Sequence, residues 1–163
     1  MGFFKHLLIK LKLKNNKAFI WNSENKSFKT IKKIQTTNLD LIVSLNNQKE
    51  TLLSNTKKFA SGNVTNNALL WGVRGNGKST LIKAVFSELS KEYKNLKLIQ
   101  LNKNNIFDIE YIYKLLENLF EMQFIIFIDD LSFEKIDSDY KIIKSTLDGS
   151  LQTQPKNIVL YIT

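Results

Sequence analysis

The octapeptide Gly72-Val73-Arg74-Gly75-Asn76-Gly77-Lys78-Ser79 fits the pattern G-x-x-x-x-G-K-S/T of a Walker A loop. An apolar run, Ala68 to Trp71, comes directly before it, and a helix-like segment, Thr80 to Leu89, comes directly after it. A glycine-rich turn in this context lets backbone N–H groups converge on phosphate oxygens, and the helix adds the positive end of its dipole. The sequence therefore predicts a phosphate-binding loop between a strand and a helix.

Each part of this loop has an expected role. Lys78 would reach the β- and γ-phosphates of a nucleotide, and the Ser79 hydroxyl would bind Mg²⁺. The alternative is a glycine turn that binds no ligand, which the strand and helix on either side disfavour. The expected cofactor-binding residues are Gly72, Val73, Arg74, Gly75, Asn76, Gly77, Lys78, Ser79 and Thr80.

A second motif stands at the end of the apolar run 124–128, which leads into the acidic pair Asp129-Asp130. Such a run is typical of a strand buried on both faces, with its carboxylates at the sheet edge where the phosphate loop lies. In the Walker B role Asp129 would hold Mg²⁺, and Asp130 would orient or deprotonate the attacking water. The expected catalytic residues are thus Asp130 and Lys78, and the expected metal ligands are Ser79 and Asp129. A buried strand before an acidic turn is the weaker alternative.

Composition narrows the class of protein. A chain of 163 residues can form one ordinary domain, and it lacks the tract of roughly 20 apolar residues that a membrane span needs, so we expect a soluble, cytoplasmic protein. Zero cysteines exclude disulfides and thiolate metal sites. The single histidine, His6, lies outside any cluster of candidate ligands, which disfavours a Ser-His-Asp or metal-hydrolase constellation. A GTPase is disfavoured because the guanine-selecting N-K-x-D element is absent.

The formal net charge is +9, and lysines spread along the chain supply almost all of the positive charge. Arg74 is the one arginine, although arginine is the residue best suited to bidentate recognition of phosphates and bases. Solvated lysine faces are therefore the favoured interpretation. A basic excess also attracts polyanions, so nucleic acid or an anionic membrane stays open as a partner.

The N-terminal third has its own pattern. Residues 3–13 place apolar side chains at 3, 4, 7, 8 and 11, which predicts a short amphipathic helix that docks on its own domain, on a partner or on an anionic membrane. Residues 18–21 and 27–31 read as a small hairpin, and 47–60 as a helix. We divide the chain into a helix-and-hairpin part, 1–35, and a nucleotide-binding core, 36–163.

The core alternates strands with helices, which predicts a parallel sheet covered by helices, with nucleotide at the carboxyl ends of the strands. The expected elements are strand 67–72, helix 78–92, strand 96–101, helix 106–121, strand 123–129, helix 138–148 and strand 157–162.

Three segments carry a family resemblance: Asn66 to Ser79, Asp129 to Glu134 and Tyr140 to Gly149. With them the chain resembles, from about Ala18 to its last residue, bacterial AAA+-type ATP-binding proteins catalogued as a domain of unknown function. The resemblance implies an α/β P-loop NTPase fold with strand order 5-1-4-3-2, ATP and Mg²⁺ as cofactors, and hydrolysis of ATP on behalf of an unidentified macromolecular client. It also implies adenine near residues 40–43 and leaves a homo-oligomer open.

The chain departs from the family pattern twice. Asn76 stands where the family usually has Thr, at a position that offers mainly its backbone. The second departure is that the sequence stops at Thr163, where the family continues into a sensor-1 stretch, a fifth strand and a helical lid. We therefore expect the last strand and lid to be missing, with the strand 67–72 open on one edge and activity reduced.

Three functional hypotheses follow. The leading one is an AAA+-type ATPase that couples Mg·ATP hydrolysis to remodelling or loading of a macromolecule. The second is a nucleotide-binding switch with little turnover, because Asp130 stands where many AAA+ ATPases use the longer Glu. The third is a basic module associated with DNA or a membrane, in which ATP is secondary.

Overall fold

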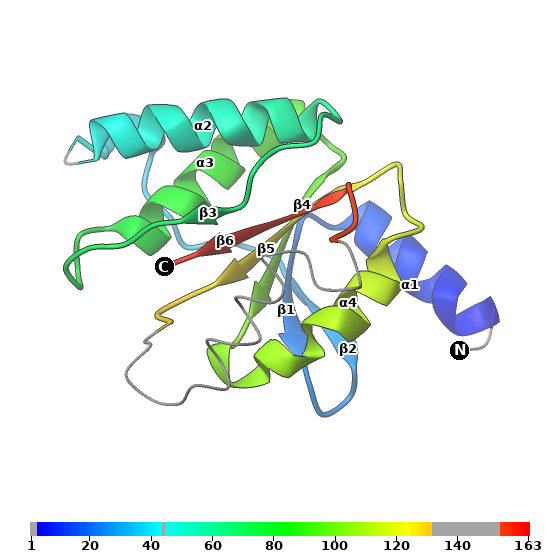
Figure 1. The fold of residues 1–163 in the computed structure, drawn as a ribbon. Helices are drawn as coiled ribbons and strands as arrows, with labels where there is room; N and C mark the ends of the chain where they lie inside the picture. Colours follow the sequence, from blue (N-terminus) through cyan, green and yellow to red (C-terminus); the bar gives the residue numbers. More distant parts are fainter. Residues whose placement is uncertain (1–2, 44, 132–153) are drawn as a thin grey trace.

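The computed structural model describes residues 3–43, 45–131 and 154–163. They form an α/β fold in which helices cover both faces of one six-stranded sheet, ordered β2-β1-β4-β5-β6-β3 (Figure 1). The strands are β1 (Ala18–Asn22), β2 (Ser27–Ile31), β3 (Ala68–Leu69), β4 (Leu96–Leu101), β5 (Gln123–Ile128) and β6 (Ile158–Ile162). The helices are α1 (Phe3–Asn15), α2 (Asn46–Ala60), α3 (Lys78–Glu92) and α4 (Ile109–Leu116), with 3-10 turns η1 (Leu39–Leu41) and η2 (Lys103–Asp108).

The four strands β3, β6, β5 and β4 are parallel neighbours, so the core has the 1-4-3-2 part of the expected strand order. Every residue of β5 and β6 is buried. Side chains alternate along β5: Ile126 packs in the core beneath α1 and α4, whereas Phe127 packs beneath α2 and α3. A strand covered on both faces needs an unbroken apolar run, which is what the sequence has there.

The N-terminal hairpin extends this sheet. β1 pairs with β2 in antiparallel orientation and with β4 in parallel orientation. The sheet as a whole is therefore mixed. The parallel sheet expected of the core is confirmed for β4, β5, β6 and β3, whereas the pairing of the hairpin with β4 was not predicted. Trp21 of β1 and Phe28 of β2 stack edge to face, 5.0 Å between ring centroids, and both are buried in the core shared with α4.

Two elements are shorter than expected. The strand predicted at 67–72 is regular only over β3, because its neighbour β6 ends at Ile162, whose carbonyl accepts the last bond from the Leu70 N–H. The helix predicted at 106–121 begins as η2, where the Asn102 side chain accepts from the Asn104 N–H, and continues as α4. Asn105 has non-helical φ and ψ and separates the turns. The predicted helix 138–148 lies outside the described residues.

The carboxylate of Asp108, at the end of η2, ties the hairpin to this part of the core. It accepts hydrogen bonds from Trp21 Nε1 at 2.8 Å, Ser23 Oγ at 2.6 Å and Lys26 Nζ at 2.5 Å, and the residue is 4% exposed. Burial disfavours the charged carboxylate, but the three hydrogen bonds and the charge of Lys26 outweigh it and lower the pKa of Asp108 below its ordinary 3.8.

We expect Asp108→Asn to lower the free energy of unfolding by about 1.5–3 kcal/mol, because a hydrogen-bonded buried charge is lost. The native pKa lies below the unfolded value, so this contribution is fully present above about pH 5 and is lost as pH falls through the native pKa. Urea unfolding at pH 7 and at pH 3 measures both effects. The exposed Asp40→Asn is the matched control, and an equal change in the two variants would contradict the role of Asp108.

Candidate functional site

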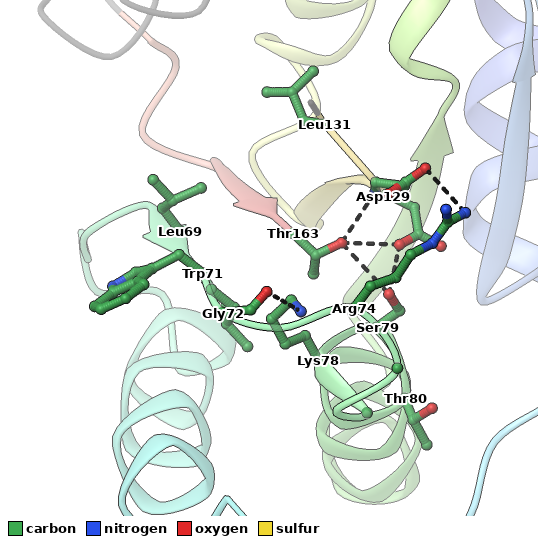
Figure 2. A pocket seen from close by; sticks show the side chains of 14 residues that line it. Leu69, Trp71, Gly72, Arg74, Lys78, Ser79, Thr80, Asp129, Leu131 and Thr163 are labelled. Carbon is green, nitrogen blue, oxygen red and sulfur yellow. Dashed lines mark hydrogen bonds and ion pairs between the residues drawn. The ribbon is translucent and has the colours of Figure 1, made fainter. Parts of the chain in front are cut away.

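A cavity of about 560 Å³ opens where the loop 72–77, the start of α3 and the carboxyl ends of β5 and β6 meet (Figure 2). Seven of the nine predicted loop residues line it, together with both predicted carboxylates, Asp129 and Asp130. The two loop residues that do not line it are Val73 and Asn76. The structure therefore brings the two sequence motifs, which are far apart along the chain, to one cavity.

The loop takes a backbone conformation that depends on glycine. Gly72, Gly75 and Gly77 have φ of 136°, 86° and 78°, in the region that L-residues with a Cβ rarely adopt. No heavy atom lies within 4 Å of the position that a Cβ would take at any of the three. The glycines are thus required by conformation and not by lack of space, and Gly77 in this conformation caps the N-terminus of α3.

The loop presents unused donors to the cavity. Within the described residues, the backbone N–H groups of 73–80 donate no hydrogen bond to the protein. The N-terminus of α3, a helix of 15 residues, lies at the same place and adds its positive dipole end. Lys78 Nζ folds back over the loop and donates to the carbonyls of Gly72 at 3.0 Å and Val73 at 2.9 Å. This cluster of donors is complementary to an anion.

Three oxygens meet on the opposite wall of the cavity. Ser79 Oγ, in the first turn of α3, lies 2.5 Å from Asp129 Oδ1, just beyond β5. Thr163 Oγ1, just beyond β6, donates to the same carboxylate oxygen at 2.9 Å and lies 3.4 Å from Ser79 Oγ. Hydroxyl and carboxylate oxygens are the hard ligands that Mg²⁺ prefers. Among the described residues there is no cluster of three or more His, Cys, Asp or Glu for a metal, and the carboxylate that contacts both hydroxyls is that of Asp129.

Asp130 points to a different set of partners. Its φ is 54°, a left-handed conformation unusual for a non-glycine residue. Lys103 Nζ donates to its carbonyl at 2.8 Å and to its Oδ2 at 3.2 Å, and Arg74 Nη2 lies 3.8 Å from Oδ2. The hydrogen bond from Lys103 and the charges of Lys103 and Arg74 lower the pKa of Asp130, so the side chain is ionised at neutral pH.

Thr163 and Lys103 were not predicted as site residues. Thr163 directly follows β6, and Lys103 lies two residues after β4. Both strands were expected to end at the carboxyl edge of the sheet, where ligands of parallel α/β folds bind. A polar residue within two positions of the end of each strand was therefore the available signal. Neither Thr163 nor Lys103, however, belongs to a recognisable motif.

A smaller cavity of about 380 Å³ lies on the other side of the loop. Three residues of the segment predicted to lie near adenine, Leu41, Ile42 and Val43, line it, and Asp40 does not. The two cavities share three lining residues, Gly75, Gly77 and Thr80. Asn76 and Thr37 complete the lining of the smaller one.

Comparison with known proteins places the chain in one family. Residues 14–163 match the model of the family described as Protein of unknown function (DUF815). No curated protein and no solved structure matches the chain. The match leaves out the first 13 residues, which form most of α1.

Proposed function

The chain belongs to the DUF815 family, and from this membership and the site we propose that it is an ATP-binding protein that hydrolyses Mg·ATP as an AAA+-type ATPase. The energy of ATP hydrolysis would drive the remodelling or loading of an unidentified macromolecule. One observation carries the proposal: Ser79 of the glycine-rich loop lies 2.5 Å from Asp129 at the end of β5. A loop Ser or Thr and a strand-end Asp share Mg²⁺ in P-loop nucleotide hydrolases.

The loop would bind the phosphates. The N–H groups of 73–80 have no protein acceptor within the described residues, so phosphate oxygens would satisfy donors that the fold leaves open. Lys78 Nζ would exchange its two carbonyl acceptors, Gly72 and Val73, for phosphate oxygens, which as charged acceptors form stronger hydrogen bonds.

The oxygen cluster fits Mg²⁺ by the chemistry of its donors. Ser79 Oγ and Asp129 Oδ1 would hold the ion, which when bound neutralises charge on the phosphates. Mg²⁺ commonly binds through one or two carboxylates plus phosphate oxygens and water, so a single carboxylate at this point is sufficient. Thr163 Oγ1 would orient Asp129 through the hydrogen bond it already donates.

Asp130 would act on the attacking water. Its pKa is lowered, so it is ionised and able to accept a hydrogen bond from that water at neutral pH. The base would lie in the smaller cavity between Leu41, Ile42 and Val43 and the loop, which supplies an apolar wall for an aromatic ring.

Phosphate release from ATP with Mg²⁺, and with EDTA in place of Mg²⁺, tests the proposal. We expect release above background with Mg²⁺ and none with EDTA. Failure to bind ATP under either condition would overturn the nucleotide assignment, whereas ATP binding with no release would reject hydrolysis and leave the second candidate below.

The second candidate is a nucleotide-binding switch with little turnover. The observation that favours it is the contact of Asp130 with Lys103 and Arg74, which engages the carboxylate that hydrolysis would need. In this candidate the ATP-bound state persists and is itself the signal. A slow rate would follow if Asp130 must leave Lys103 to reach the water.

We expect Lys103→Gln to raise turnover at pH 7, by up to about fivefold, because one exposed ion pair no longer holds Asp130. The acidic limb of the pH–rate profile should move to higher pH, since the main cause that lowers the pKa of Asp130 is removed. The exposed Lys114→Gln on α4 is the matched control. A lower rate with an unmoved acidic limb would show that Lys103 assists the reaction and does not restrain Asp130.

A further inference from the structure

Helix α1 carries apolar side chains on two opposite faces. On the inner face Leu13 is fully buried in the core and Ile9 packs against it. On the outer face four large apolar side chains remain exposed: Phe4, Leu7, Leu8 and Leu11. We propose that this outer face of α1 binds the surface of a membrane that contains anionic lipids.

The outer face has the geometry of an interfacial helix. At about 100° per residue its four apolar side chains fall within an arc of about 100°, on the side opposite Leu13. Lys12 and Lys14, both exposed, border this arc on either side. Lysines in that position extend their ammonium groups to lipid headgroups while the apolar side chains between them enter the acyl boundary.

The charge around the helix selects an anionic surface. Residues 1–23 contain five lysines and no Asp or Glu; the first acidic residue of the chain is Glu24. Each lysine close to an anionic membrane surface contributes attraction that is independent of any specific contact. An apolar arc bordered by the exposed lysines Lys12 and Lys14 therefore favours anionic lipid over zwitterionic lipid.

Other occupants fit this face less well. A second copy of the helix would bring Lys12 and Lys14 close to the same lysines of its partner, and like charges repel. Nucleic acid would gain from the lysines but not from four exposed apolar side chains, because phosphate contacts are polar. The helix lies almost wholly before the region that matches the family model.

The inner face is anchored, so α1 can bind a surface without leaving the core. Lys10 Nζ lies 2.6 Å from Glu121 Oε1, and Lys97 Nζ donates to the carbonyls of Lys14 and Asn16 at 3.1 and 2.9 Å. No helix among the described residues is long and apolar enough to cross a membrane, and the proposal needs none because α1 would lie in the interface plane.

Co-sedimentation of the 163-residue chain with vesicles tests the proposal. We expect binding to phosphatidylcholine vesicles with 30% phosphatidylglycerol and none to pure phosphatidylcholine. Leu8→Ser with Leu11→Ser should weaken binding at least tenfold, because about 1.5–3 kcal/mol accompanies burial of each leucine. These side chains are 65% and 47% exposed, so the fold should tolerate the change. The control is Val64→Ser with Phe107→Ser, at 70% and 62% exposed.

The charged border is tested separately. Lys12→Gln with Lys14→Gln should weaken binding to the anionic vesicles about 30-fold, the effect of two lysines near the surface. The matched control is Lys57→Gln with Lys58→Gln, two exposed lysines in the last turn of α2. Equal losses in the two pairs would overturn the proposal, because the general positive charge of the protein would then explain binding.

A labelling experiment reports insertion directly. The chain contains no cysteine, so Leu8→Cys and Val64→Cys each give one site for a polarity-sensitive fluorophore. We expect a blue shift on anionic vesicles from position 8 only. No shift at position 8, or an equal shift at both positions, would overturn the proposal. So would self-association in sedimentation equilibrium that Leu8→Ser and Leu11→Ser abolish, because a second copy would then occupy the face.

Discussion

Lys78→Ala is expected to weaken ATP binding by roughly tenfold to a hundredfold while the fold stays intact. A charge-assisted hydrogen bond is worth about 1.5–3 kcal/mol, and the ammonium group would make at least one to the phosphates. Within the part of the chain that the structure describes, this group donates to two exposed loop carbonyls, of Gly72 and Val73, so its loss leaves no buried partner unsatisfied there. Isothermal titration with ATP and Mg²⁺ measures the change.

Lys91→Ala is the matched control, since Lys91 stands in the last turn of the same helix, α3, and is exposed. It removes the same charge from the protein without touching the cavity. Equal ATP affinity in the parent chain and Lys78→Ala would refute the phosphate role of Lys78. An equal loss in both variants would assign the effect to overall charge.

The paired aspartates are expected to divide their roles. Asp129→Asn should weaken Mg²⁺-dependent ATP binding at least tenfold, because the Asp129 carboxylate contacts Ser79 Oγ, the other expected Mg²⁺ ligand. Asp130→Asn should leave ATP affinity within about twofold and lower the turnover rate by 100-fold or more, the usual contribution of a positioned general base. Titrations with and without Mg²⁺, and phosphate release at saturating ATP, separate the two effects.

Each variant is the control for the other, since both remove one negative charge from neighbouring positions. Asparagine at 129 keeps an oxygen that can accept from Thr163, so the local fold should persist. Equal loss of affinity in both variants, with no separate effect on turnover, would contradict this division of roles.

The sequence was most informative where a pattern follows from local physics. The strand β5 and the helix α3 lie within one residue of their expected bounds, because a doubly buried strand and a helix behind a glycine loop each need a particular composition. The meeting of Ser79 with Asp129 also followed, since parallel strands end at one edge of the sheet.

The sequence was less informative about contacts between residues far apart along the chain. Nothing in residues 18–31 indicates that β1 pairs with β4, since a hairpin by itself does not specify which strand it joins. The contact of Lys103 with Asp130 depends on how η2 leaves β4, and the side chain was one lysine among many. For α1, spacing predicted the helix, but only packing shows that Leu13 is buried and Leu8 is not.

Calorimetric titration of ATP into the 163-residue chain, with Mg²⁺ and then with EDTA, bears most directly on the proposed nucleotide site. Among the described residues the N–H groups of 73–80 have no protein acceptor, and Ser79 lies beside Asp129, so we expect saturable binding of one ATP per chain that weakens when Mg²⁺ is removed. The absence of any heat of binding with Mg²⁺, from a chain whose circular dichroism shows a folded α/β protein, would contradict it.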